Sequence, residues 1–227
     1  MNTIRPLRGN QSDYGGSGAC AAIACALAAH MLADPEFGMV GMKAAMARIE
    51  AVMQQAAIEW NAQQAGFLTA AEVLERFSTI GERLRIESEV ASDITGPLLD
   101  GMGCEIVPSV RDTLLAWMQD AARRTSTACV VTRGGYTFLL CYAKPYYFIV
   151  DSHANTVSRH ESSLLRLDAA SEEELHTSAG IVIRTRQYAQ VLNWVLEYAP
   201  HDANDRSEAL TSSNQVDFVF LALSLNN

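Results

Sequence analysis

The segment from Cys20 to Leu32 is apolar at almost every position and is rich in alanine, the residue with the highest helix propensity. A helix that is apolar on all sides must be buried, so this segment predicts a core helix that ends near Asp34. Four glycines and one proline within residues 1–19 predict an irregular segment before it. Any fold of this chain must therefore surround one helix with other elements.

Hydrophobic patterns divide the rest of the chain into two parts. Apolar residues first recur at helical spacing, and Thr69 with Glu72 has the form of a capping box. Short runs rich in β-branched and aromatic residues follow later, which predicts an antiparallel meander. We expect further helices at about residues 40–61, 69–77, 109–124 and 185–198, strands at 84–90, 128–132, 136–142, 146–150, 181–184 and 216–225, and loops at 95–103 and 201–214. This plan is α+β, a single domain over residues 1–227 with a helical part at about 20–125 packed on a mainly antiparallel sheet at about 126–227.

Composition narrows the classes of function. The 227 residues are 49% hydrophobic and 19% charged, which is typical of a soluble globular protein. The net charge is −9 and the Lys and Arg residues are scattered, so nucleic acid is not an expected partner. No run reaches the roughly 18 apolar residues of a membrane span, and the first residues lack an apolar core of the length typical of a signal peptide. Five cysteines without framework spacing indicate a reducing compartment, so we expect an intracellular protein, or one exported without such a signal.

Cys20 is the first candidate for chemistry because it opens the buried helix. Only a thiolate attacks, a free thiol ionises near pH ~8.5, and the N–H groups and positive dipole end of a helix favour the anion. The glycines ahead of Cys20 allow the backbone to approach a substrate closely. A cysteine in an alanine-rich helix is more often a small core residue, which is how we interpret Cys25. Cys129 and Cys141 lie in expected strands, and we interpret them as core residues too.

A carboxylate and a histidine follow directly on the apolar strand expected at 146–150. Asp151 and His153 are two residues apart, so in extended backbone their side chains point to the same side. The carboxylate can then fix the tautomer of the imidazole and stabilise the imidazolium, although Asp, Ser and His are also common turn residues. Upstream, the amide of Gln11, or alternatively of Asn10, can donate to an oxyanion. This order of Gln, helix-opening Cys and strand-borne His is that of papain-like cysteine proteases.

Two segments resemble the deubiquitinating protease domain of herpesvirus large tegument proteins. The first runs from Gly9-Asn10-Gln11 through the following glycines to Cys20. The second is residues 146–153, which carry an Asp-x-His motif. The resemblance implies a papain-like fold with Cys20 as nucleophile, His153 as general base, Asp151 as its orienting residue and Gln11 as oxyanion donor. It implies a thiol-dependent isopeptidase that cleaves conjugates after the C-terminal glycine of ubiquitin or a ubiquitin-like protein. If the chain is a viral protein or a bacterial effector, the resemblance implies that it is located in the host cytoplasm or nucleus.

Other functions remain open from the sequence. The same triad supports amidase, deamidase or acyltransferase chemistry on another substrate, and such a fold can also act as a non-catalytic ubiquitin-binding module. Thiol chemistry requires no cofactor, and the absence of CxxC or HExxH spacing predicts no metal site. Gly134 and Gly135 predict an ordinary hairpin turn with Tyr136 at its edge. The negative charge suggests that a carboxylate pairs with the Arg-containing C-terminus of ubiquitin; the candidates are Glu72, Glu75, Asp93, Asp100 and Asp120.

Overall fold

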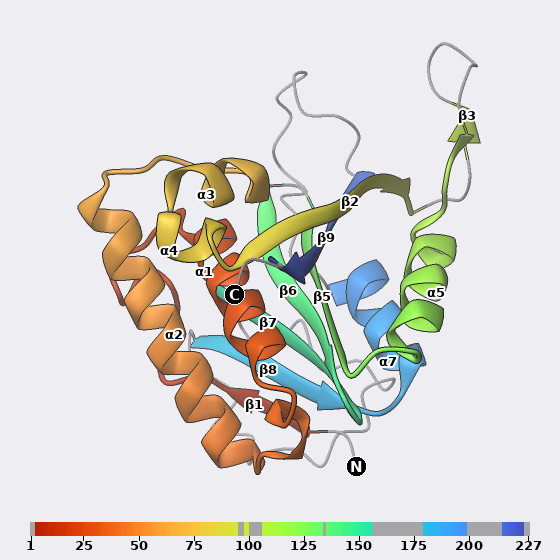
Figure 1. Ribbon diagram of the computed structural model, residues 1–227, viewed down its shortest axis with the longest axis horizontal. Coiled ribbons are helices and arrows are strands. Elements are labelled where there is room, and N and C mark those ends of the chain that lie inside the picture. The colour runs from red at the N-terminus through yellow and green to blue at the C-terminus, as the bar shows by residue number, and fades with distance from the viewer. Residues whose placement is uncertain are drawn as a thin grey trace.

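A computed structural model describes residues 3–94, 98–99, 106–133, 135–155, 179–198 and 215–224. The strands are β1 (Thr3–Pro6), β2 (Leu84–Asp93), β3 (Leu98–Leu99), β4 (Ile106–Val107), β5 (Ser126–Arg133), β6 (Tyr136–Ala143), β7 (Tyr146–Asn155), β8 (Ala179–Thr185) and β9 (Gln215–Leu223). Seven of them form one sheet in the order β1-β8-β7-β6-β5-β9-β2, and all its neighbouring strands are antiparallel (Figure 1). The short strands β3 and β4 pair with each other.

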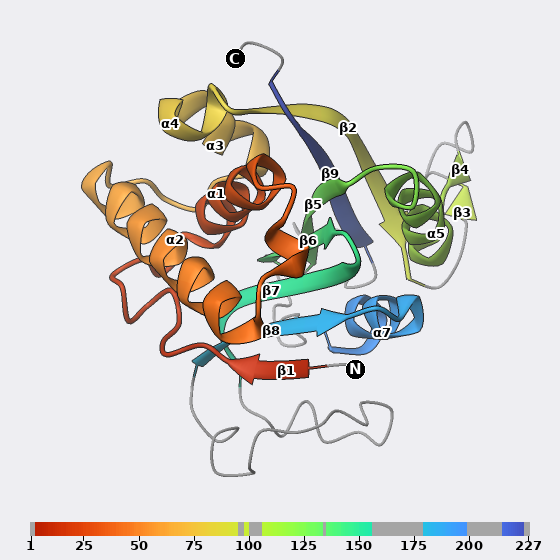
Figure 2. The ribbon, with the colours of Figure 1, turned by 60° about the horizontal axis from the view of Figure 1, so that its bottom comes forward.

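Helices lie on both sides of this sheet (Figures 1 and 2). On one side are α1 (Cys20–Ala33), α2 (Met42–Ala62), α3 (Ala70–Arg76) and α4 (Ser78–Gly81), with a 3₁₀ turn at Phe37–Met39. On the other side are α5 (Val110–Ala121) and α7 (Tyr188–Asn193), and a π-helical turn at Trp194–Tyr198 continues α7. The predicted α+β class, with N-terminal helices packed on an antiparallel sheet, is confirmed.

Alternating residues of the central strands supply two separate cores. Along β5, Ala128 and Val130 belong to the apolar cluster around α1, whereas Cys129 and Val131 belong to the cluster around α5 and α7. Successive side chains of a strand point to opposite faces, and here both faces are covered. The central strands are therefore apolar almost throughout, unlike strands that have one face in water.

Helix α1 is the buried helix that the alanine-rich segment predicts. Eleven of its 14 residues are buried, and it packs between α2 and the strands β5 and β6. It begins at Cys20, as expected, and no side chain caps its N-terminus at Ala19. The first N–H groups of a helix have no partner inside the helix, so this end favours a negatively charged group.

Several local predictions are confirmed. Thr69 and Glu72 form the capping box of α3, and the side chain of Ser109 caps α5. The three predicted strands of the meander are β5, β6 and β7. The tryptophans fall in the cores: Trp194 and Trp117 are buried, and Trp60 packs partly buried against the α1 cluster.

The predicted division into a helical part and a sheet part is wrong in detail. Residues 3–6, expected to be irregular, form β1 at one edge of the sheet, and β2 from the N-terminal half forms the other edge. Helices α5 and α7 cover the second face of the sheet. The loop expected at 95–103 contains β3, and the helix expected to reach residue 124 ends at Ala121. The loop predicted at 201–214 lies outside the described residues.

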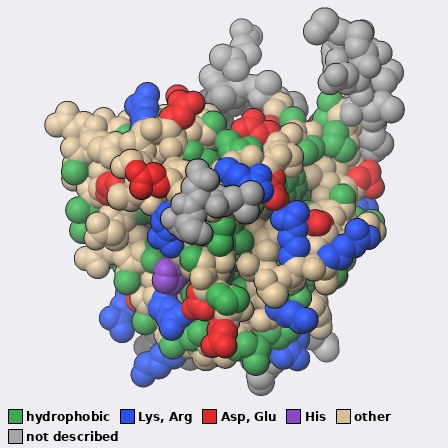
Figure 3. Space-filling view, in the orientation of Figure 1, with side chains coloured by type: hydrophobic (Ala, Val, Ile, Leu, Met, Phe, Trp, Pro, Cys, Tyr) green, Lys and Arg blue, Asp and Glu red, His purple; other side chains and the backbone are tan. Residues whose placement is uncertain are grey.

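The charge of the surface and the length of the helices both bear on possible partners. On the face seen in Figure 3, acidic and basic side chains are interspersed, so this face offers no continuous basic surface. Among the residues that the structure describes, no helix has both the length and the apolar character needed to cross a bilayer.

Candidate active site

Asp151 and His153 lie near the end of β7 and contact each other. Nδ1 of His153 is 2.6 Å from Oδ1 of Asp151, and the same oxygen accepts the backbone N–H of His153 at 3.0 Å. Asp151 is fully buried, and the β7–β8 pairing shifts register after it. The carboxylate therefore holds a proton on Nδ1 and leaves Nε2 of the ring for another partner.

That partner is Cys20, at the first position of α1. Its side chain is hydrogen-bonded to His153 and is only 5% exposed. Burial raises the pKa of the Cys20 thiol, but the hydrogen bond and charge of His153, with hydrogen bonds from Thr137, outweigh burial and hold that pKa below its usual value. Burial likewise lowers the pKa of His153, but Asp151 and Cys20 raise it to about 9. Both shifts favour the thiolate–imidazolium form of the pair.

Gln11 lies between the histidine strand and the nucleophile helix. Its backbone N–H donates to the carbonyl of Ser152 at 2.8 Å, and its side-chain oxygen accepts from the Ser152 hydroxyl at 3.2 Å. Its own carbonyl accepts from the N–H of Gly16 at 2.9 Å, four residues before Cys20. The alternative candidate, Asn10, uses its side-chain oxygen to accept the N–H of Ser12 in a local turn. The structure thus brings Gln11 to the site, and its role as oxyanion donor stays a prediction.

Two residues that the sequence did not identify as site residues lie beside the Cys-His pair. The ring of Tyr136 contacts His153 edge to face, with centroids 4.8 Å apart. Thr137, its neighbour at the start of β6, lowers the pKa of the Cys20 thiol through hydrogen bonds of its backbone and side chain, and its hydroxyl is also 3.0 Å from that of Thr132. The sequence marked Tyr136 only as the edge of a turn. Strand β6 reaches this site through the register of β6 on β7, which is not visible in local sequence.

Comparison with known proteins finds a similar fold but no match in sequence. No protein-family model matches the chain, and no curated protein matches it in sequence. Its structure is similar to the ubiquitin-specific protease encoded by a tegument protein of murine cytomegalovirus, solved in complex with a ubiquitin-based suicide substrate. The likeness has a TM-score of 0.58 at 11% sequence identity and covers 98% of this chain and 86% of the viral one. This chain has the fold of a herpesvirus tegument protease. The resemblance predicted from the two motif segments is confirmed at the level of fold.

In this tegument-protease fold, the glycines before the nucleophile have a structural reason to be present. Gly18 has a φ of +110°, and a Cβ built there would lie 3.3 Å from the ring of Trp60 and 3.4 Å from that of Phe67. At Gly16, a Cβ would lie 2.9 Å from that of Ala57. A side chain at either position would therefore displace the turn that delivers Cys20.

The other described cysteines are core residues, as predicted. Cys25, Cys129 and Cys141 are fully buried, and burial raises the pKa of each thiol, to about 12 for Cys25. Cys104 lies outside the described residues. Within the described part of the chain, no three His, Cys, Asp or Glu side chains converge as metal ligands would.

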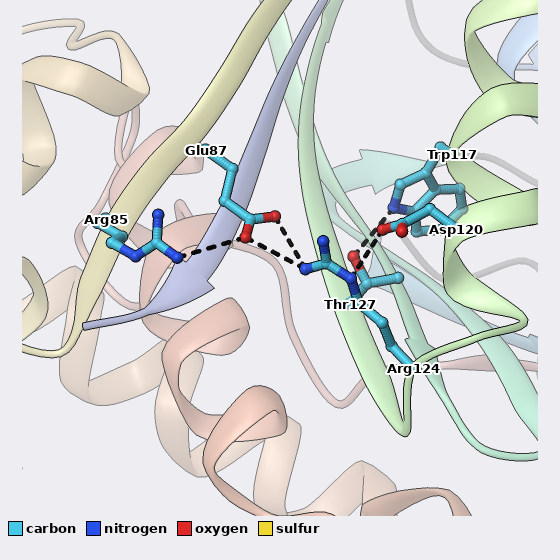
Figure 4. Close-up of polar contacts among 6 residues, drawn as sticks. All are labelled: Arg85, Glu87, Trp117, Asp120, Arg124 and Thr127. Carbon is cyan, nitrogen blue, oxygen red and sulfur yellow. Dashed lines mark hydrogen bonds and ion pairs between the residues drawn. The ribbon is translucent and has the colours of Figure 1, made fainter. Parts of the chain in front are cut away.

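The acidic residues proposed from sequence to pair with a substrate tail have other roles or lie elsewhere. Glu72 accepts two hydrogen bonds from Thr69 at the start of α3, which lowers its pKa. Asp120 pairs with Arg124 at 2.8 Å, in a chain of ion pairs that runs on to Glu87 of β2 (Figure 4). Asp93 is buried, Glu75 is exposed on α3, and Asp100 lies outside the described residues. Glu72 and Asp120 are thus already engaged within the protein.

Proposed function

We propose that this protein is a thiol-dependent deubiquitinase that cleaves conjugates after the C-terminal glycine of ubiquitin. One observation carries the proposal: Cys20, with a lowered thiol pKa at a helix N-terminus, is hydrogen-bonded to a histidine that a buried aspartate orients. The fold shared with a ubiquitin-specific protease supports ubiquitin as the substrate.

The reaction proceeds in two halves. The Cys20 thiolate attacks the carbonyl carbon of the terminal glycine, and the carbonyl electron pair moves to oxygen. When the tetrahedral intermediate collapses, the C–N bond breaks, and the imidazolium of His153 gives its proton to the leaving amine. A thioester between Cys20 and ubiquitin remains. His153, now neutral, then takes one proton from the water that attacks the thioester, and the C–S bond breaks to expel the Cys20 thiolate. The carboxylic acid of ubiquitin loses the second proton to solvent, and the thiolate–imidazolium pair is restored.

We expect two groups to stabilise the oxyanion of each intermediate. The uncapped N-terminus of α1 supplies backbone N–H groups at Cys20. Gln11, held by Ser152 and Gly16, supplies a side-chain amide in the same region. Because both groups are fixed by hydrogen bonds within the protein, little reorganisation is needed during the reaction.

The test is release of a fluorophore from the C-terminus of ubiquitin by the wild type, Cys20→Ala and His153→Ala. We expect turnover by the wild type alone, and a covalent adduct with Cys20 when ubiquitin carries a C-terminal electrophile. A ubiquitin-like modifier with the same fluorophore tests the choice of substrate. If all three folded proteins are equally inactive on ubiquitin, the proposal fails. Labelling of Cys20 by a small thiol reagent would then direct the search to other acyl substrates, and binding without turnover would favour a binding module.

A further inference from the structure

A groove of about 660 Å³ lies between α5 and the edge strand β2. Thr127 of β5 and Phe220 of β9 contribute to its floor. Trp117 and Phe220, which both line it, belong to or pack against the apolar cluster around α5 and α7, whereas α1 lies in the other cluster. The groove is therefore on the face of the sheet opposite to α1 and is separate from the candidate active site (Figure 1).

The middle of the groove is apolar and open. Asp112, Ala116 and Asp120 are spaced by four residues, so they share one face of α5, and all three line the groove. At 1.5 Å per residue they span about 12 Å. Ala116 is exposed and carries only a methyl group, and the rings of Trp117 and Phe220 line the groove beside it. A concave apolar surface of this kind is typical of a binding site for an apolar side chain.

The charge of the groove is negative. Of the described residues that line it, three carry a carboxylate (Glu87, Asp112 and Asp120) and one, Arg124, carries a cation. Arg124 is already paired, at 3.0 Å with Glu87 and at 2.8 Å with Asp120 (Figure 4). Asp112 accepts the hydroxyl of Ser109 and forms no ion pair with any residue that the structure describes. The end of the groove at Asp112 therefore favours a cationic group.

Thr127 adds a hydrogen-bond donor to the floor. Its side chain is buried, and its hydroxyl oxygen accepts the indole N–H of Trp117 at 3.3 Å. Among the described residues, none accepts a hydrogen bond from this hydroxyl in return. A hydroxyl can donate one hydrogen bond as well as accept, so Thr127 favours a ligand that carries a carbonyl group.

We propose that this groove is a docking site for an extended segment of a partner protein, in which a Lys or Arg pairs with Asp112 and a large apolar side chain two residues away packs beside Ala116. Four residues of a helix span about 6 Å, and two residues of an extended chain span about 6.6 Å with side chains on one face. The two spacings match, and a backbone carbonyl of the segment accepts the hydroxyl of Thr127. This docking site goes beyond the cleavage proposed above and does not depend on it, because Cys20 lies on the other face of the sheet.

The test is fluorescence anisotropy of a fluorescein-labelled peptide, Ser-Lys-Ser-Phe-Ser, titrated with the whole chain. Ala116→Tyr fills the middle of the groove, so the affinity should fall at least about tenfold. Asp112→Asn removes the unpaired charge, so the affinity should fall about threefold, and added salt should reduce this difference. The matched controls are Leu115→Tyr, at an exposed position of α5 outside the groove, and Glu75→Gln on α3. Both should bind the peptide like the wild type.

Two altered peptides test the chemistry of the segment. Replacing its Lys by Glu, or its Phe by Ser, should each weaken binding to the wild type at least about tenfold, and circular dichroism checks that every variant is folded. Equal affinity of the wild type, Ala116→Tyr and Asp112→Asn overturns the proposal, and so does the absence of binding at millimolar protein. A dimer of the wild type that Ala116→Tyr dissociates would assign the groove to a second copy and would also overturn it. Failure of the ubiquitin cleavage test leaves this docking site standing, because the anisotropy measurement needs no turnover.

Discussion

Cys20 and Cys25 lie five residues apart on the same helix and have opposite properties. Their exposed fractions are similar, 5% and 0%. Burial raises the thiol pKa at both positions, and at Cys25 it acts without opposition and raises the pKa to about 12. At Cys20, partners from two strands of the sheet reverse the shift.

The difference between the two cysteines shows what makes a thiol reactive in this fold. Burial alone favours the neutral form, so a buried cysteine is inert unless hydrogen-bond donors and a cation compensate. Cys20 has the uncapped helix end, the imidazolium of His153 and the donors of Thr137, and Cys25 has apolar neighbours.

The largest effect is expected from the nucleophile itself. Cys20→Ala removes the attacking group, so kcat/KM for the ubiquitin fluorophore substrate should fall by at least roughly 10⁴-fold. Circular dichroism should show an unchanged fold, because alanine fits the small site at the start of an alanine-rich helix. Activity that survives in Cys20→Ala would show that another group performs the attack.

Asp151→Asn tests how much the carboxylate of Asp151 contributes to the function of His153. The loss in kcat/KM should be roughly 10²- to 10⁴-fold, because the amide no longer stabilises the imidazolium. The pH profile carries the sharper result. In the wild type His153 stays protonated until the pH rises through about 9, so activity should fall on the alkaline side there. Without the carboxylate the pKa of His153 falls, and the alkaline limb should move to lower pH. An unchanged alkaline limb would mean that another group titrates.

The sequence predicted those parts of this site that depend on local pattern. The helix that starts at Cys20 follows from alanine content, and the Asp151–His153 pair follows from strand alternation. Strand order and register involve residues far apart in the chain, so β1 at the sheet edge and Thr137 beside Cys20 were missed.

Thr137→Val tests the contribution of a single donor. Valine keeps the shape and the backbone N–H but removes the hydroxyl that donates to the thiolate. One hydrogen bond to a charged group contributes about 1.5 kcal/mol, so the pKa of Cys20 should rise by about one unit. The measurement is the rate of alkylation of Cys20 by iodoacetamide as a function of pH. A profile that does not move would assign the lowered pKa to His153, the helix end and the backbone N–H of Thr137, without the hydroxyl.

The smallest effect on activity is expected at Cys25, and it completes the contrast. Cys25→Ala removes one sulfur atom from a fully buried site, so the free energy of unfolding should fall by about 1 to 2 kcal/mol, since the cavity left by one atom is small. Urea unfolding should show a lower midpoint with the same dependence on denaturant. Because no polar group of the site depends on Cys25, kcat/KM should stay within about twofold of the wild type. A loss of activity at unchanged stability would place Cys25 in the chemistry and would break the distinction between the two thiols.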